Sequence, residues 1–200
     1  MKETARSFDR SGGHPALDFV NTLDERPFPA PIENLAGYAD LVRFTELTGL
    51  LAPGQARKLR KRAAAGHAAI ARRARELREQ LYCVLSAWHQ KRSVPRRELR
   101  AITSAIRVAR AARVLAVSGG RTIARHDWLS PHPAELPLHA CALAIEDLLT
   151  DADRARIRKC GASDCEVYFI DRSKGRRRHW CSMNNCGNRE KQRRWRAEAV

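Results

Sequence analysis

Four cysteines near the C-terminus have the residue type and the spacing of a metal site. Cys160 and Cys165 form a C-x4-C pair, and Cys181 and Cys186 form a second such pair after fifteen intervening residues. Two turns of this kind can present four thiolates to one tetrahedral Zn²⁺, with Zn–S distances of about 2.3 Å. Four protein thiolates leave no open coordination position, so the sequence predicts one structural zinc ion per chain and no catalysis by the metal.

The alternative for these four cysteines is a pair of disulfides. The N-terminus lacks the apolar segment of a secretion signal and no run of about 18 apolar residues occurs, so we expect a soluble cytoplasmic protein with reduced thiols. His179 has an awkward spacing to Cys181 for a second ligand, and we interpret it as a neighbour of the site. Cys83 and Cys141 stand alone and are interpreted as core or inert thiols.

The residues between and after the cysteine pairs predict the elements that hold them. In EVYFIDRSKGRRRHW, Val167 and Phe169 precede a polar turn and Trp180 follows it, which is typical of a β-hairpin. GNREKQRRWRAEAV contains no proline and is rich in helix formers, so a helix should begin near Asn188. A knuckle, a β-hairpin and a helix make a treble-clef-like zinc finger, in which the metal supplies much of the folding free energy. Phe169, Trp180 and Trp195 would form its small core.

The same segment is strongly basic. From Arg172 to Arg196 there are ten basic residues and one acidic residue, Glu190. Four residues at i, i+3, i+4 and i+7 share one face of the predicted helix: Arg189, Gln192, Arg193 and Arg196. Such a face suits the DNA major groove, where Arg can read guanine and Gln can read adenine. The cations of the predicted turn suit phosphate contacts: Lys174, Arg176, Arg177 and Arg178.

Other interpretations of this basic segment stay open. It could be a zinc-stabilised module whose basic face binds an acidic protein partner, or a module that binds structured RNA. Asn188 also suits the N-cap of the last helix, and Arg189 could pair with Asp171 across the hairpin instead of contacting a base.

The whole chain carries an excess of positive charge. It has 38 Lys and Arg against 22 Asp and Glu, a formal net charge of +16, which favours a polyanionic partner. Residues 51–113 hold 17 basic and 3 acidic residues, whereas residues 1–50 have a net charge of −3. Arg outnumbers Lys by 31 to 7, so the basic middle either widens a DNA footprint or reflects a compositional bias on solvated helix faces. Membrane docking is not favoured, because the apolar stripes have the width of core-facing helices.

The residues before the finger predict a mainly α-helical domain with one small β-hairpin. Apolar spacing predicts helices over about 34–48, from Ile70 to Trp88, after Pro95 and over about 138–149, and Pro53 fits the start of another. Two β-prone runs around Gly119 and Gly120 predict the hairpin within 114–125. We place the boundary between this N-terminal domain, 1–153, and the finger, 154–200, near residue 153.

One polar cluster in the N-terminal domain is a candidate ligand site. Asp18, Asn21 and Asp24 lie close together in the sequence and could line a pocket for a small-molecule effector. Asx residues at turns or helix caps explain the same pattern. The chain has no P-loop, no dinucleotide-binding glycine pattern, no G-x-S-x-G and no H-E-x-x-H, so we do not predict an enzyme.

Residues 160–191, CGASDCEVYFIDRSKGRRRHWCSMNNCGNREK, resemble the CGNR zinc-finger family, which is named for the tetrapeptide found here at 186–189. The F-x-D-x-S element at 169–173 and the W-C-S-M run at 180–183 support the resemblance. Glu166 stands where the family commonly has Gly, and Gly175 stands where it has Asn, but neither position is a predicted ligand.

The N-terminal stretch GHPALDFVNTLDER, residues 13–26, similarly resembles the opening of the ABATE domain, which precedes this finger in bacterial proteins assigned to stress-induced transcription regulation. Together the two resemblances imply a DNA-binding regulator. We therefore predict a zinc-dependent transcription regulator that contacts double-stranded DNA with its finger and uses its N-terminal domain for sensing or dimerisation. A monomeric finger reads only a few base pairs, so specific recognition would require a homodimer.

Overall fold

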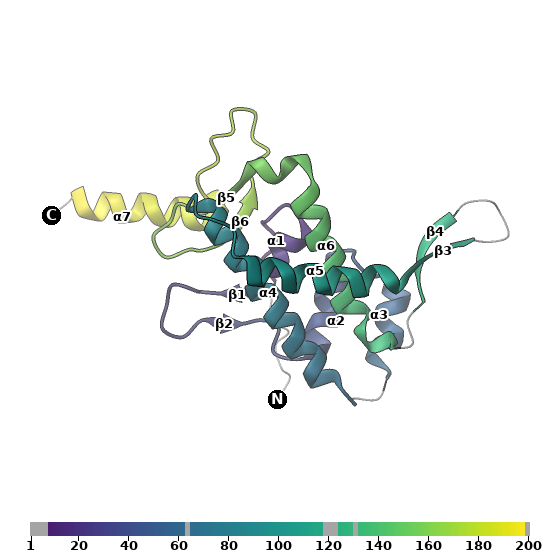
Figure 1. The fold of residues 1–200 in the computed structure, drawn as a ribbon. Coiled ribbons are helices and arrows are strands. Elements are labelled where there is room, and N and C mark those ends of the chain that lie inside the picture. Colours follow the sequence, from purple (N-terminus) through teal and green to yellow (C-terminus); the bar gives the residue numbers. More distant parts are fainter. Residues whose placement is uncertain (1–7, 63–64, 118–123, 130–131, 199–200) are drawn as a thin grey trace, which may run out of the picture. The chain divides into compact units, whose positions relative to one another are not determined.

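The computed structural model describes residues 8–62, 65–117, 124–129 and 132–198 (Figure 1). They divide into two compact units. One unit combines the N-terminal residues up to Asn34 with the C-terminal residues from Leu148 onward, and the other contains Leu35–Asp147. The units thus group the chain differently from a linear division near residue 153, because N-terminal residues pack with the finger. The division into an N-terminal domain, 1–153, and a finger, 154–200, stays a prediction.

The unit Leu35–Asp147 is built from helices and one strand pair. Its helices are α2 (Tyr38–Leu47), α3 (Pro53–Arg60), α4 (His67–His89), α5 (Arg96–Ala111), the short 3₁₀ helix η1 (Pro133–Glu135) and α6 (Leu136–Thr150), which continues into the other unit. Strands β3 (Arg113–Val117) and β4 (Ala124–Trp128) pair antiparallel, with Val114 opposite Asp127. The prediction of a mainly helical chain with a small hairpin is confirmed, while its turn at Gly119 and Gly120 lies outside the described residues.

Local sequence explains where these helices begin and end. α2 begins after Gly37, whose backbone N–H donates to the Asp40 carboxylate (3.1 Å), and it ends before Gly49, which has a φ of +74°. α3 begins at Pro53 and α5 follows Pro95, as expected of a ring that fixes φ. α4 buries one stripe of its surface, which includes Ile70, Ala74, Leu77, Leu81 and Leu85.

The other unit holds the predicted finger. Its elements are α1 (Pro15–Val20), β1 (Leu23–Asp24), β2 (Ile32–Glu33), the 3₁₀ helix η2 (Ala152–Arg156), β5 (Ile157–Lys159), β6 (Tyr168–Ile170), the π-helical turn η3 (Met183–Gly187) and α7 (Asn188–Glu198). α1 starts after His14, whose Nδ1 accepts the backbone N–H of Ala16 (3.2 Å). Four of its six residues are apolar and fully buried: Ala16, Leu17, Phe19 and Val20. A helix this short is stabilised by that burial and not by its own hydrogen bonds.

The strands of the finger pair differently from the sequence prediction. We expected residues 167–170 to pair with those before Trp180, but β6 pairs with β5, so the first cysteine pair lies in the turn of the hairpin. After β6 the chain turns around the buried Asp171. Its carboxylate accepts the backbone N–H groups of Ser173 (2.9 Å) and Arg178 (3.0 Å) and the Ser173 hydroxyl (2.6 Å). The Asp171 side chain, and not a second strand, thus accepts the hydrogen bonds of this loop. Residue periodicity does not reveal such a contact.

Of the three aromatic residues predicted to form the core of the finger, two are in it. Phe169 is fully buried beside Ala162 and the cysteines, and Trp180 packs partly buried against them. Trp195, however, is 78% exposed, so its predicted place in the core is wrong. No residue of α7 is buried, because the helix extends beyond the residues that cover the cysteines.

The two isolated cysteines differ in exposure. Cys141 is buried on α6, as a core position predicts, whereas Cys83 is exposed on α4, so of the two interpretations the core position is wrong for Cys83. Among the described residues, no helix combines the length and the apolar character needed to cross a membrane.

Candidate metal centre and nucleic-acid interface

The sulfurs of Cys160, Cys165, Cys181 and Cys186 all lie within 4.8 Å of one another. The Sγ of Cys181 is 3.8 Å from that of Cys165 and 3.5 Å from that of Cys186. A tetrahedral zinc ion with Zn–S bonds of about 2.3 Å holds its sulfur ligands roughly 3.8 Å apart. The four cysteines therefore form a site able to bind one zinc ion, as their spacing predicted.

Short backbone contacts hold each cysteine pair in place. In the first pair, the backbone N–H of Cys160 donates to the carbonyl of Val167 (2.9 Å), and that of Cys165 donates to the carbonyl of Ala162 (3.2 Å). The N–H of Cys181 then donates to Cys160 Sγ (3.4 Å), which joins the two pairs. These hydrogen bonds position the cysteines without a contribution from the metal, as expected of a site whose surroundings orient its ligands.

The thiols perturb one another strongly. Hydrogen bonds with Cys165 and Cys181 hold the pKa of Cys160 far below the usual thiol range. The contact with Cys160 raises the pKa of Cys165 to about 12, and it also raises the pKa of Cys181. The raised pKa values of Cys165 and Cys181 mean that all four sulfurs ionise together only with a cation between them. Zinc binding would displace the shared protons, because the metal binds thiolates and not thiols.

Helix α7 is attached to the first cysteine pair by ion pairs. The guanidinium of Arg189 donates to Cys186 Sγ (3.3 Å) and to the Asp164 carboxylate (2.7 Å). Arg193 also pairs with Asp164, and it donates to Ser163 Oγ (2.8 Å). Burial raises the pKa of the Asp164 carboxyl. Hydrogen bonds from Arg189 and Arg193 lower it, and the net result is a pKa below the usual Asp range. Asp164 is not among the predicted site residues, and its only signal in the sequence is a carboxylate between two predicted ligands.

Two alternatives for the start of α7 are wrong. Arg189 pairs with Asp164 and not with Asp171, which the loop after β6 already uses. Asn188 has helical dihedral angles and its side chain donates to the carbonyl of Asn184 (3.4 Å), so it is no N-cap. Ser182 takes that role for the π-helical turn, because its hydroxyl accepts the N–H of Asn185 (3.3 Å).

Arg178 has internal partners. Its guanidinium donates to the carbonyls of Trp180 (3.0 Å), Cys181 and Ser11 (3.4 Å), and it lies 4.3 Å from the centre of the Phe169 ring. The side chain thus connects the N-terminal segment, the finger core and the second cysteine pair. These contacts indicate that Arg178 stabilises the finger. The sequence did not indicate this, because Arg178 is one of three consecutive arginines.

The remaining predicted DNA-binding side chains are exposed: Lys174, Arg176, Arg177, Gln192 and Arg196. Lys191 and Arg194 on α7 are exposed as well. They lie outside the i, i+3, i+4, i+7 pattern, because that spacing selects a single face of the helix. With no buried residue in α7, every side of the helix presents its cations to solvent.

The structure separates the members of the predicted effector cluster. Asp18 is buried, and its carboxylate accepts the backbone N–H of Gly12 (2.9 Å). Asn21 is also buried, and its amide makes two hydrogen bonds with the backbone of Tyr168, donating to the carbonyl (2.9 Å) and accepting the N–H (3.0 Å). Asp24 is exposed and accepts the N–H of Glu25 (2.8 Å). Asn21 and Asp24 line a shared cavity, and Asp18 does not.

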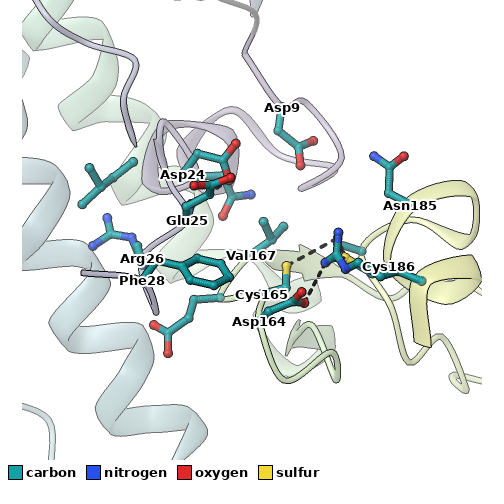
Figure 2. A pocket seen from close by; sticks show the side chains of 15 residues that line it. Asp9, Asp24, Glu25, Arg26, Phe28, Asp164, Cys165, Val167, Asn185 and Cys186 are labelled. Carbon is teal, nitrogen blue, oxygen red and sulfur yellow. Dashed lines mark hydrogen bonds and ion pairs between the residues drawn. The ribbon is translucent and has the colours of Figure 1, made fainter. Parts of the chain in front are cut away.

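This cavity, of about 350 Å³, lies within the unit that holds the finger (Figure 2). Asp24, Glu25 and Phe28 of the N-terminal segment line one side, and Cys165 and Cys186 line the other. The effector site stays a prediction. A small molecule that contacts both Asn21 and Asp24 would have to bind in this cavity.

The buried carboxyl of Asp18 predicts a pH dependence of stability. Burial raises its pKa to about 6, so the protonated form stabilises the fold. That contribution is complete below about pH 4, the pKa of an unfolded Asp, and is lost as the pH rises through 6. Asp18→Asn keeps the acceptor for Gly12, so its free energy of unfolding should exceed that of the wild type at pH 7 by on the order of 2 kcal/mol.

Urea unfolding of both proteins at several values between pH 5 and 7.5 checks this. The difference should shrink toward pH 5, and subtraction removes effects of the shared titrating groups. A difference that stays constant across this range would contradict the raised pKa of Asp18.

Comparisons with known proteins agree with the geometry. A family model described as ABATE, "Putative stress-induced transcription regulator", matches residues 13–152, and a model described as the CGNR zinc finger matches residues 156–199. Neither description is that of an enzyme family. A search of curated proteins finds no match. With one model covering more than half of its residues and the other covering the four-cysteine site, the chain belongs to the ABATE family and ends in a CGNR zinc finger.

Proposed function

We propose that this protein regulates transcription by binding double-stranded DNA with its zinc-held C-terminal finger. The observation that carries the proposal is the exposure of many cations on two parts of the finger, the loop after β6 and helix α7. Cations presented on a rigid scaffold favour phosphate binding, since each neutralised phosphate releases counterions. A bare α-helix also has the width that the major groove of B-DNA admits.

The contacts of the finger divide its cations by role. Arg178 is engaged by three carbonyls, and Arg189 and Arg193 are paired with Asp164, so these three position the loop and the helix. A phosphate would have to compete with those partners. We assign to DNA the exposed side chains that remain: Lys174, Arg176 and Arg177 in the loop, and Gln192, Arg194 and Arg196 on α7. A role of the N-terminal part in sensing or dimerisation is part of the same proposal.

The test removes two α7 cations whose side chains are exposed and form no ion pair among the described residues. Arg194→Ala/Arg196→Ala should weaken binding of the zinc-loaded full chain to a labelled duplex by about ten-fold near physiological salt. The slope of log affinity against log salt concentration should become shallower by about two units. Zinc content and helical circular dichroism should stay unchanged, because both side chains are exposed. Fluorescence anisotropy over a salt series measures these quantities.

The matched control is Arg96→Ala/Arg97→Ala, which removes the same charge from exposed positions at the start of α5. An equal loss in the control would mean that the α7 cations have no special role, and that binding follows net charge or extends over the basic residues 51–113. No loss in the α7 variant would reject the assignment of this helix to DNA. Competition with structured RNA, and capture of genome fragments in place of a random duplex, then distinguish RNA binding and unspecific binding from recognition of an operator.

A further inference from the structure

The cavity of the finger unit reaches the sulfurs of the metal site. Three of the four predicted ligands line it: Cys165, Cys181 and Cys186. Cys165 is also the most exposed of the four, because the other three are buried. Of the ligands that line the cavity, Cys165 is thus the most exposed to a small molecule that enters it (Figure 2).

The wall of the cavity is acidic. Asp9, Asp24 and Glu25 line it from the N-terminal segment, and the one cation from that segment is Arg26. Two further carboxylates, of Asp164 and Glu166, are paired with arginines of α7 and with Lys159 (2.7 Å). Negative charge around a cavity lowers the local concentration of anions and leaves that of neutral molecules unchanged. Neutral reagents should reach the sulfurs more readily than anionic ones.

We propose that Cys165 is a site of oxidation by a neutral peroxide that enters through this cavity, and that its oxidation releases the zinc ion. The Cys165 thiolate attacks one oxygen of hydrogen peroxide, the O–O bond breaks, and the departing hydroxide takes up a proton to become water. The sulfenic acid that remains is attacked by the Cys181 thiolate. The S–S bond forms, and a second hydroxide leaves and is protonated. Two thiolates are oxidised by two electrons, and one peroxide is reduced to two waters.

Geometry selects these two cysteines. The Sγ atoms of Cys165 and Cys181 are 3.8 Å apart, within reach of a disulfide after a small movement. Cys186 is disfavoured as the first nucleophile, because the Arg189 guanidinium donates to its sulfur. Loss of two of four thiolates leaves the zinc ion without a closed site. Any effect on DNA binding rests on the function proposed above, whereas zinc release and the disulfide do not.

The experiment treats the zinc-loaded full chain with hydrogen peroxide in a Cys83→Ser background, because Cys83 is exposed and would consume reagent. A chromogenic chelator follows zinc release, and alkylation with peptide mass spectrometry maps the disulfide. We expect one zinc released for every two thiols lost, with Cys165 joined to Cys181. Absence of peroxide-induced zinc release, or a disulfide that excludes Cys165, would overturn the proposal.

A second arm tests the route. Asp24→Asn/Glu25→Gln should accelerate zinc release by an anionic reagent, 5,5′-dithiobis(2-nitrobenzoate), by about three-fold at low salt. Release by peroxide should keep its rate, because the peroxide is neutral. The control Glu76→Gln/Glu98→Gln removes the same charge in the other unit and should change neither rate. Equal acceleration of both reagents in the cavity variant would show that it loosens the site, which would refute the cavity as a charge-selective route.

Discussion

A Cys181→Ser protein is expected to bind no zinc and to lose the folded structure of the whole unit that contains the finger. Cys181 is buried between Cys165 and Cys186, and a structural zinc ion contributes on the order of 10 kcal/mol to the folding of such modules. The loss should extend to α1, because the N–H of Ile170 donates to the carbonyl of Gly12 (2.9 Å) in the same unit. Metal analysis and amide hydrogen exchange of residues 15–21 and 168–170 measure both effects.

The control for this substitution is Cys83→Ser, which changes an exposed thiol outside the metal site. It should leave zinc content and exchange unchanged. If α1 kept its protection in Cys181→Ser, the N-terminal segment would fold independently of the metal. The grouping of that segment with the finger would then be incidental to stability.

Replacement of Asn21 by alanine should reduce the free energy of unfolding by about 2 to 4 kcal/mol. The amide of Asn21 bonds both the N–H and the carbonyl of Tyr168, and both residues are buried. Alanine removes both hydrogen bonds from backbone groups that the fold buries, and each unsatisfied buried group costs about 1 to 3 kcal/mol. Urea unfolding, monitored at the finger by zinc release, measures the change.

Asp24→Ala serves as the comparison, since Asp24 belongs to the same sequence cluster but is exposed. Its effect should stay within about 0.5 kcal/mol, as for other surface positions. If Asn21→Ala were equally mild, the two hydrogen bonds with Tyr168 would not stabilise the unit. The role of Asn21 would then have to be sought in ligand binding at the cavity.

Several features could be predicted from the sequence because they depend on short spacings. Two C-x4-C pairs give four ligands whatever the rest of the chain does, and the sulfurs do converge. The helices of Leu35–Asp147 follow from apolar periodicity and from prolines at their starts, since both act within a few residues. The hairpin of the finger could not be placed this way, because β5 lies before the first cysteine pair and the loop after β6 closes on Asp171.

The basic residues of the finger show why charge patterns leave individual roles open. Arg176, Arg177 and Arg178 are adjacent and identical in type, yet the first two are exposed and the third is held by carbonyls and by the Phe169 ring. Trp195 looks apolar enough for a core, but no element of the described chain covers it, and it is exposed. Whether a side chain is buried depends on contacts between segments that are distant in the sequence. Neither composition nor local spacing predicts those contacts.

By itself, the sequence determined the zinc ligands, the helical character of the chain and the excess of positive charge. Those properties arise from residue types and from spacings of a few residues. Only the tertiary structure decided that the N-terminal segment packs with the finger, that Asn21 bonds Tyr168, and that Asp164 holds α7 to the first cysteine pair. Each of these contacts joins residues that are 25 or more positions apart. Such pairings form because burial leaves polar groups only those partners that the fold brings near, and no local rule selects them.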